Sequence, residues 1–127
     1  ENIQKNNVST LVTLLGSDMF EQIEGRFDLI VSNPPYIPTG DIPTLMREVR
    51  EHEPVLALDG GADGLKFYRI LAEKGKDYLN PGGAMLLEVG IGQAAEVAGL
   101  LAENGFLQIE IYRDLSGVER VVRGLRP

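Results

Sequence analysis

The stretch Phe27-Asp28-Leu29-Ile30-Val31-Ser32-Asn33-Pro34-Pro35-Tyr36 decides the fold, because an apolar run ends directly in two prolines. Residues 27–32 have the composition of a buried parallel strand. The prolines fix two φ angles, remove two backbone N–H donors and push Asn33 into an extended conformation. We therefore predict a strand over residues 27–32, followed by a polar corner, residues 33–36, at the sheet end where α/β proteins bind ligands.

The corner is predicted to bind an NH2 group. The side-chain oxygen of Asn33 and the carbonyl oxygen of Pro34 can together accept both of its hydrogens, and the ring of Tyr36 supplies a flat wall. Asn-Pro and Pro-Pro are also ordinary turn signals that end an element. The position directly after a strand favours the binding interpretation.

Composition excludes several classes of function. The chain has 127 residues, 43% of them hydrophobic, which is typical of one domain with one core. The chain has 12 Lys and Arg and 19 Asp and Glu, so its net charge is −7. This charge does not favour binding to DNA or to an anionic membrane. Cysteine is absent and His52 is the single histidine, which argues against disulfides, a metal site and Ser-His catalysis. Without a long apolar run or a leader, we expect a soluble cytoplasmic protein.

The rest of the sequence predicts an α/β sheet that is mostly parallel with an antiparallel C-terminal edge. Further strands are expected over residues 8–15, 84–89, 106–113 and 119–123. Helices are expected over about residues 65–79 and 93–103, the first ended by residues 80–83. A short helix over residues 44–50, capped by Asp41, is expected inside a long loop that would cover the corner.

Other polar and glycine positions leave alternatives open. Asp18 can accept hydrogen bonds from a ligand or cap the turn that follows it. Glu88, near the end of a predicted buried strand, indicates either a structural ion pair or a cleft carboxylate. Gly90-Ile91-Gly92 approaches a nucleotide-binding spacing, but without an acidic partner a plain strand-to-helix turn is favoured. The charged residues 48–53, with His52, are interpreted as solvated surface.

With these motifs, the chain resembles the HemK/PrmC family of protein-glutamine methyltransferases, which use S-adenosyl-L-methionine to modify the Gly-Gly-Gln motif of peptide chain release factors. The matching stretches are residues 16–20, 27–38, 48–50, 53–54, 57–61, 63–65, 67–69, 81–83, 87–90, 114–115 and 120–122. Asn-Pro-Pro-Tyr alone is shared with enzymes that methylate the exocyclic amine of adenine. The segment from residue 48 to residue 69 favours the glutamine-modifying branch.

The resemblance implies a class I, Rossmann-like methyltransferase sheet, with residues 1–127 as the C-terminal portion of the catalytic domain. It implies that Asp18 and Met19 lie along the adenine of the cofactor and that Asn33 contacts both cofactor and substrate. Pro34, Pro35 and Tyr36 would hold the glutamine side chain. The expected catalytic residues are Asn33, Pro34 and Tyr36, which would act by positioning the amide nitrogen, since no side chain is an obvious strong base.

The family pattern also includes a helical recognition domain, a glycine-rich first strand-to-helix loop and an acidic ribose-binding residue, which this sequence lacks. We therefore expect no methyl transfer by this chain alone, and self-association through a bare edge of the strand at residues 27–32. A release factor is the expected partner. Two other functions stay open: a nucleic-acid adenine or guanine methyltransferase, disfavoured by the acidic charge, and a non-catalytic binding module.

Overall fold

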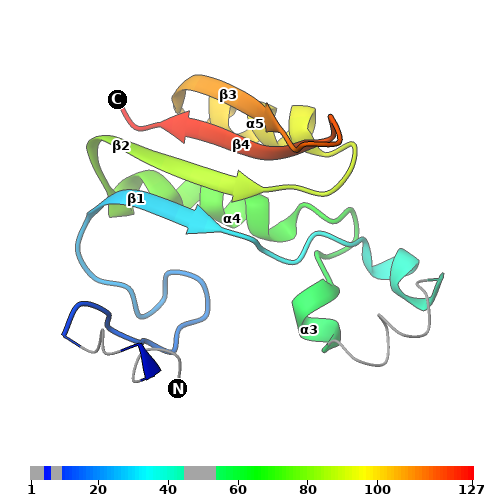
Figure 1. Cartoon of the computed structure of the whole chain (residues 1–127), viewed down its shortest axis with the longest axis horizontal. Helices are drawn as coiled ribbons and strands as arrows, with labels where there is room; N and C mark the ends of the chain where they lie inside the picture. The colour runs from blue at the N-terminus through cyan, green and yellow to red at the C-terminus, as the bar shows by residue number, and fades with distance from the viewer. Residues whose placement is uncertain (1–4, 7–9, 45–53) are drawn as a thin grey trace.

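A four-stranded sheet with helices against one face forms the centre of the computed structural model, which describes residues 5–6, 10–44 and 54–127 (Figure 1). The spatial order of the described strands is β1 (Phe27–Ser32), β2 (Leu79–Glu88), β4 (Glu119–Leu125) and β3 (Leu107–Arg113). The helices are α3 (Val55–Leu58), α4 (Lys66–Lys74) and α5 (Ala94–Glu103), with 3-10 helices η1 (Thr39–Thr44) and η2 (Gly75–Tyr78).

The strand directions confirm the predicted fold class. β1 pairs with β2 in parallel, and β4 pairs antiparallel with both β2 and β3. Three of the four strands therefore run in one direction, and the C-terminal hairpin supplies the antiparallel part. The carboxyl ends of β1 and β2 lie side by side, since Ser32 is in register with Leu87.

The core lies between the sheet and the two longer helices, α4 and α5, which cover the same face (Figure 1). Their inward residues follow helical spacing, and β2 contributes alternate residues. Many residues of these elements and of the turn after β2 are at most 3% exposed. They include Tyr68, Leu71, Ala72, Met85, Leu87, Val89, Ala94, Val97 and Leu101. This packing fixes the ends of β1 and β2, where the predicted site lies.

The predicted strand over residues 8–15 is wrong for the part that the structure describes. Residues 10–15 form a turn followed by irregular backbone, and residues 8–9 lie outside the described ranges. Leu11 and Leu14 are 83% and 82% exposed. A strand needs a neighbour for its N–H and C=O groups, and no described strand pairs with this segment.

The predicted helix over residues 65–79 is shorter than expected. α4 ends at Lys74, η2 follows, and β2 begins at Leu79, so residues 80–83 belong to a strand and not to a helix stop. Main-chain pairing explains the difference, because Gly82 N donates to Arg126 O at 2.9 Å and Arg126 N donates to Gly83 O at 2.8 Å.

The predicted short helix over residues 44–50 lies outside the described residues except for Thr44. Thr44 ends η1, and Asp41 lies inside η1. The cover that the long loop was expected to form stays a prediction for the same reason.

Candidate active site

The corner at residues 33–36 follows β1 directly and leaves two acceptors without a partner among the residues that the structure describes. Asn33 is exposed and Pro34 is buried. Within the described part of the chain, neither the Asn33 side chain nor the Pro34 carbonyl makes a hydrogen bond. A hollow of about 150 Å³ beside them is lined by Asn33, Pro34, Tyr36, Ile37, Ala57 and Leu58. Its volume is below that of typical small-molecule pockets, which suits a single side chain.

The chain after the corner is bound to residues 58–61 by main-chain hydrogen bonds. Ile37 N donates to Leu58 O at 3.0 Å, and Gly60 N donates to Ile37 O at 2.8 Å. The Asp59 carboxylate accepts from Thr39 Oγ1 at 2.6 Å and from Gly61 N at 2.9 Å. These bonds, that from Thr39 first, lower the pKa of Asp59. The corner is thereby fixed on its C-terminal side.

Tyr36 lies in a cradle of three glycines. A Cβ at Gly90 would lie 2.6 Å from Tyr36 Cδ2, and one at Gly64 would lie 2.4 Å from Tyr36 O. A Cβ at Gly60 would lie 2.8 Å from Tyr36 Cα. Such distances are closer than carbon contacts allow, so these positions require glycine if Tyr36 is to stay where it is. The turn at residues 90–92 joins β2 to α5, as the sequence favoured.

A hydrogen bond between Tyr68 and Glu88 joins α4 to the end of β2. The Tyr68 hydroxyl donates to the Glu88 backbone carbonyl at 2.6 Å. Burial, followed by the proximity of Tyr36 and Glu88, raises the pKa of Tyr68, so it stays a protonated donor. The Glu88 side chain itself is exposed. Glu88 makes no ion pair among the described residues, so the structural alternative is not found, and the cleft alternative stays a prediction.

The turn at residues 17–22 presents Asp18 and Met19. Ser17 Oγ accepts from Gln22 N at 2.9 Å and donates to Met19 O at 2.9 Å. The hydroxyl of Ser17, and not the carboxylate of Asp18, therefore stabilises this turn. Asp18 is exposed, and its side chain makes no hydrogen bond with the residues that the structure describes. The capping alternative for Asp18 is not found, and its carboxylate is accessible to a ligand.

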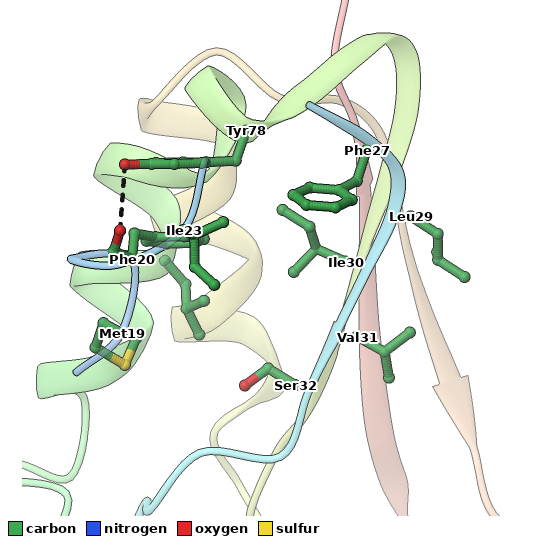
Figure 2. A pocket seen from close by; sticks show the side chains of 10 residues that line it. Met19, Phe20, Ile23, Phe27, Leu29, Ile30, Val31, Ser32 and Tyr78 are labelled. Atoms are coloured by element: carbon green, nitrogen blue, oxygen red, sulfur yellow. Dashed lines mark hydrogen bonds between the residues drawn. The ribbon is translucent and has the colours of Figure 1, made fainter. Parts of the chain in front are cut away.

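An apolar cavity of about 370 Å³ lies between this turn and β1 (Figure 2). Phe20 stacks on Tyr78 with ring centroids 4.5 Å apart, and the Tyr78 hydroxyl donates to the Phe20 carbonyl at 3.5 Å. Met19 lines the cavity from the turn, and Ser32 lines it from β1, pointing inward in Figure 2. Since Ser32 directly precedes Asn33, the cavity extends from Met19 toward the corner.

Sequence comparison finds release factor glutamine methyltransferases among the relatives of this chain. No family model matches the chain. The release factor glutamine methyltransferase of Geobacter sulfurreducens is 53% identical over 114 residues, which are 89% of this chain and 40% of the relative. That of Rhodospirillum rubrum is 52% identical over 109 residues, 86% of this chain and 34% of the relative. The chain belongs to the release factor glutamine methyltransferase family. It spans less than half the length of these two family members.

Solved structures agree with this assignment. A release-factor-specific protein-(glutamine-N5) methyltransferase from Alicyclobacillus acidocaldarius is 36% identical, with a TM-score of 0.52 over 80% of this chain and 49% of that one. A methyltransferase from Pyrococcus furiosus is 20% identical, with a TM-score of 0.64 over 98% of this chain and 54% of that one, which shows the fold alone. The sheet is thus that of class I methyltransferases.

Other parts of the predicted site have separate outcomes. The charged residues 48–53, including His52, lie outside the described ranges. Among the described residues, no group of three or more His, Asp or Glu could hold a metal ion, and no helix is long and apolar enough to cross a membrane.

Sequence reasoning missed Gln93, which it treated only as the start of a helix. In the structure, Gln93 Nε2 donates to Tyr36 O at 2.9 Å.

Proposed function

We propose that the protein containing this chain transfers a methyl group from S-adenosyl-L-methionine to the glutamine side-chain amide nitrogen of the Gly-Gly-Gln motif in peptide chain release factors. The observation that carries the proposal is a pair of acceptors, Asn33 Oδ1 and Pro34 O, that have no partner in the described part of the chain and lie beside a side-chain-sized hollow. The names of the relatives support it. With a release factor as the methylated substrate, the reaction would take place in the cytoplasm.

The acceptors at the corner address the weakness of an amide as a nucleophile. Its nitrogen lone pair is delocalised by the resonance that gives a peptide bond its barrier of about 18–20 kcal/mol. Hydrogen bonds from the two N–H groups to Asn33 and Pro34 favour a pyramidal nitrogen with a localised lone pair, and this gain is realised mainly in the transition state. Tyr36 packs beside the amide and restricts its orientation. Holding the reacting atoms in line is worth up to about 7–11 kcal/mol.

The donor side of the proposed site consists of Asp18, Met19 and Asn33. The free carboxylate of Asp18 fits the exocyclic amine of an adenine, and the apolar cavity beside Met19 has the volume of a small-molecule pocket. When bound, the cofactor supplies an electrophilic methyl group on a sulfonium sulfur. Transfer forms one N–C bond and breaks one S–C bond, and the amide nitrogen loses one proton to water.

A methylation assay with the full-length gene product tests the proposal. Labelled methyl groups should enter a release factor, and the release factor with its Gly-Gly-Gln glutamine replaced by alanine should remain unlabelled. DNA and RNA oligonucleotides serve as competing substrates, because an exocyclic amine also fits the two acceptors. Labelling of nucleic acid with none in the release factor would replace the proposal by the nucleic-acid alternative. Cofactor binding without transfer to either would favour a binding module.

A further inference from the structure

We propose that Gln93 is a positioning residue, which holds Tyr36, and through it Asn33 and Pro34, in the geometry that orients the substrate amide. The inference rests on the proposed function and deepens it. Gln93 Nε2 donates to the carbonyl oxygen of Tyr36 at 2.9 Å. Its Oε1 accepts from Gly90 N at 2.9 Å, in the turn between β2 and α5. One side-chain amide therefore joins the corner to the end of β2.

The corner needs an anchor of this kind at Tyr36. Asn33 Oδ1 and Pro34 O must remain unpaired to bind a substrate, so bonds from these atoms to the protein cannot fix the corner. Pro34 and Pro35 have no N–H to donate. Among the described residues, the bond from Gln93 is the one side-chain hydrogen bond to residues 33–36. Gln93 therefore binds the corner at Tyr36 O and leaves Asn33 Oδ1 and Pro34 O available to the substrate.

Gln93 is itself held by the core. It is the N-cap residue of α5, and the following residues Ala94, Val97 and Leu101 are at most 1% exposed. Gly64 and Gly90 leave the space that its amide occupies, since Cβ atoms there would lie 3.1 Å from Nε2 and 2.9 Å from Oε1. The half-buried Gln93 amide pairs with the acceptor Tyr36 O and the donor Gly90 N at once. This position therefore requires a side chain that has both a donor and an acceptor and that fits the space.

Replacement of Gln93 by Glu separates positioning from simple packing. At neutral pH the carboxylate has the shape of glutamine but cannot donate to Tyr36 O, so the corner shifts. We expect kcat to fall by about 10²-fold, the cost of a misplacement near 1 Å, with KM for the methyl donor within about twofold of wild type. Below the carboxyl pKa, the protonated acid donates again, so the ratio of variant to wild-type kcat rises as pH falls toward about 5.

Two further variants complete the test in the full-length protein. Gln108→Glu adds the same charge on exposed β3, and its kcat should stay near that of wild type. Gln93→Met keeps the length but removes both hydrogen bonds, so the Gly90 amide should lose its protection from hydrogen exchange. Wild-type kcat in Gln93→Glu at neutral pH, a ratio independent of pH, or unchanged exchange at Gly90 in Gln93→Met would each overturn the inference.

The exchange measurement also distinguishes this inference from the proposed function. Protection of the Gly90 amide by Gln93 requires no substrate, so it can be tested even if the release factor is not methylated. Absence of methyl transfer by the wild type would therefore contradict the proposed function, while the exchange result still decides whether the Gln93 side chain is bound to Gly90 in the orientation that directs its Nε2 at Tyr36 O. If the wild type methylates nucleic acid instead, the same kcat ratios are measured on that substrate.

Discussion

The corner at residues 33–36 and the turn at residues 17–22 form the two sides of the proposed site, but they are held in different ways. The corner is fixed by a cradle of three glycines, by Gln93 and by bonds from the residues that follow it, Ile37 and Thr39, to residues 58–61. The turn is held by Ser17 within its own loop and by Phe20 stacked on Tyr78. The substrate side of the proposed site is thus held by several hydrogen bonds to other elements, whereas the cofactor side is held by bonds within its own turn and by the contacts of Phe20 with Tyr78.

Removal of the Asn33 side chain should have the largest effect on kcat, because it removes Oδ1, one of the two proposed acceptors for the substrate amide. We expect Asn33→Ala to lower kcat of the full-length protein by about 10²-fold or more, since one acceptor on the amide is lost. Stability should change by at most about 0.5 kcal/mol, because Asn33 is exposed and has no described partner.

The matched variant Asn33→Asp keeps an acceptor oxygen and should retain more activity than Asn33→Ala. Methyl transfer rates and thermal unfolding measure the two effects. Near-normal turnover by Asn33→Ala would remove Asn33 from the mechanism.

The glycine cradle allows a test of the rigidity of the corner. In Gly90→Ala, the added methyl would lie 2.6 Å from the Tyr36 ring, so we expect a loss of about 1–3 kcal/mol in stability and a lower kcat. Gly99→Ala is the matched control, because Gly99 lies in α5 with no atom within 4 Å of its Cβ position. That change should stabilise the helix by up to about 1 kcal/mol. Equal effects of the two substitutions on kcat would contradict a rigid corner.

The outer edge of β1 offers a test on the weakly held side of the molecule. No described strand pairs with this edge, and Val31 beside it is 69% exposed. We expect the 127-residue chain to self-associate, and Val31→Lys to reduce the association. Light scattering over a concentration series measures both.

Leu107→Lys on the opposite edge is the control for this experiment. β3 has register shifts and carries the charged residues Glu110 and Arg113, features that disfavour edge pairing. We therefore expect Leu107→Lys to change self-association little. A similar decrease in both variants would show that the edge of β1 is not the contact.

The smallest expected effect is on the pH dependence of stability, and it comes from Asp63 in the loop that carries Gly64. Asp63 accepts two bonds from Arg69 and one from Leu65 N, and these lower its pKa to about 2. A lowered folded-state pKa stabilises the fold above the unfolded value of 3.8, and this contribution is lost as pH falls from about 4 to 2. The Tm difference between wild type and Asp63→Asn should shrink over that range. A constant difference would show that the pair does not support the loop.

The sequence predicted those parts of the fold that depend on local chemistry. The strand at residues 27–32, the corner and the helix after Gln93 follow from apolar patterning and from proline. The strand over residues 8–15 failed because pairing depends on a neighbour that is distant in sequence. Residues 80–83 were predicted as a helix stop, since their pairing with Arg126 could not be inferred from proline and glycine alone.

The site was predicted in part for similar reasons. The sequence left an ion pair or a cleft role open for Glu88; Met85, Leu87 and Val89 face the core, so the alternation of a strand turns Glu88 outward. Gln93 was missed because its partner, Tyr36, lies 57 residues away. The roles of Asn33, Pro34, Pro35 and Tyr36 in substrate binding, and of Asp18 and Met19 in cofactor binding, stay predictions until tested.

The position of β4 has a consequence for how the protein is made. β4 follows the other described strands in the chain but lies between β2 and β3 in the sheet. During synthesis on a ribosome, β3 therefore has no described sheet partner until residues 119–125 have emerged. The β1–β2 pair and its helices can assemble earlier, so the frame of the corner forms before the sheet is complete. A nascent chain stalled just before Glu119 would expose an unpaired β3 to chaperones and proteases.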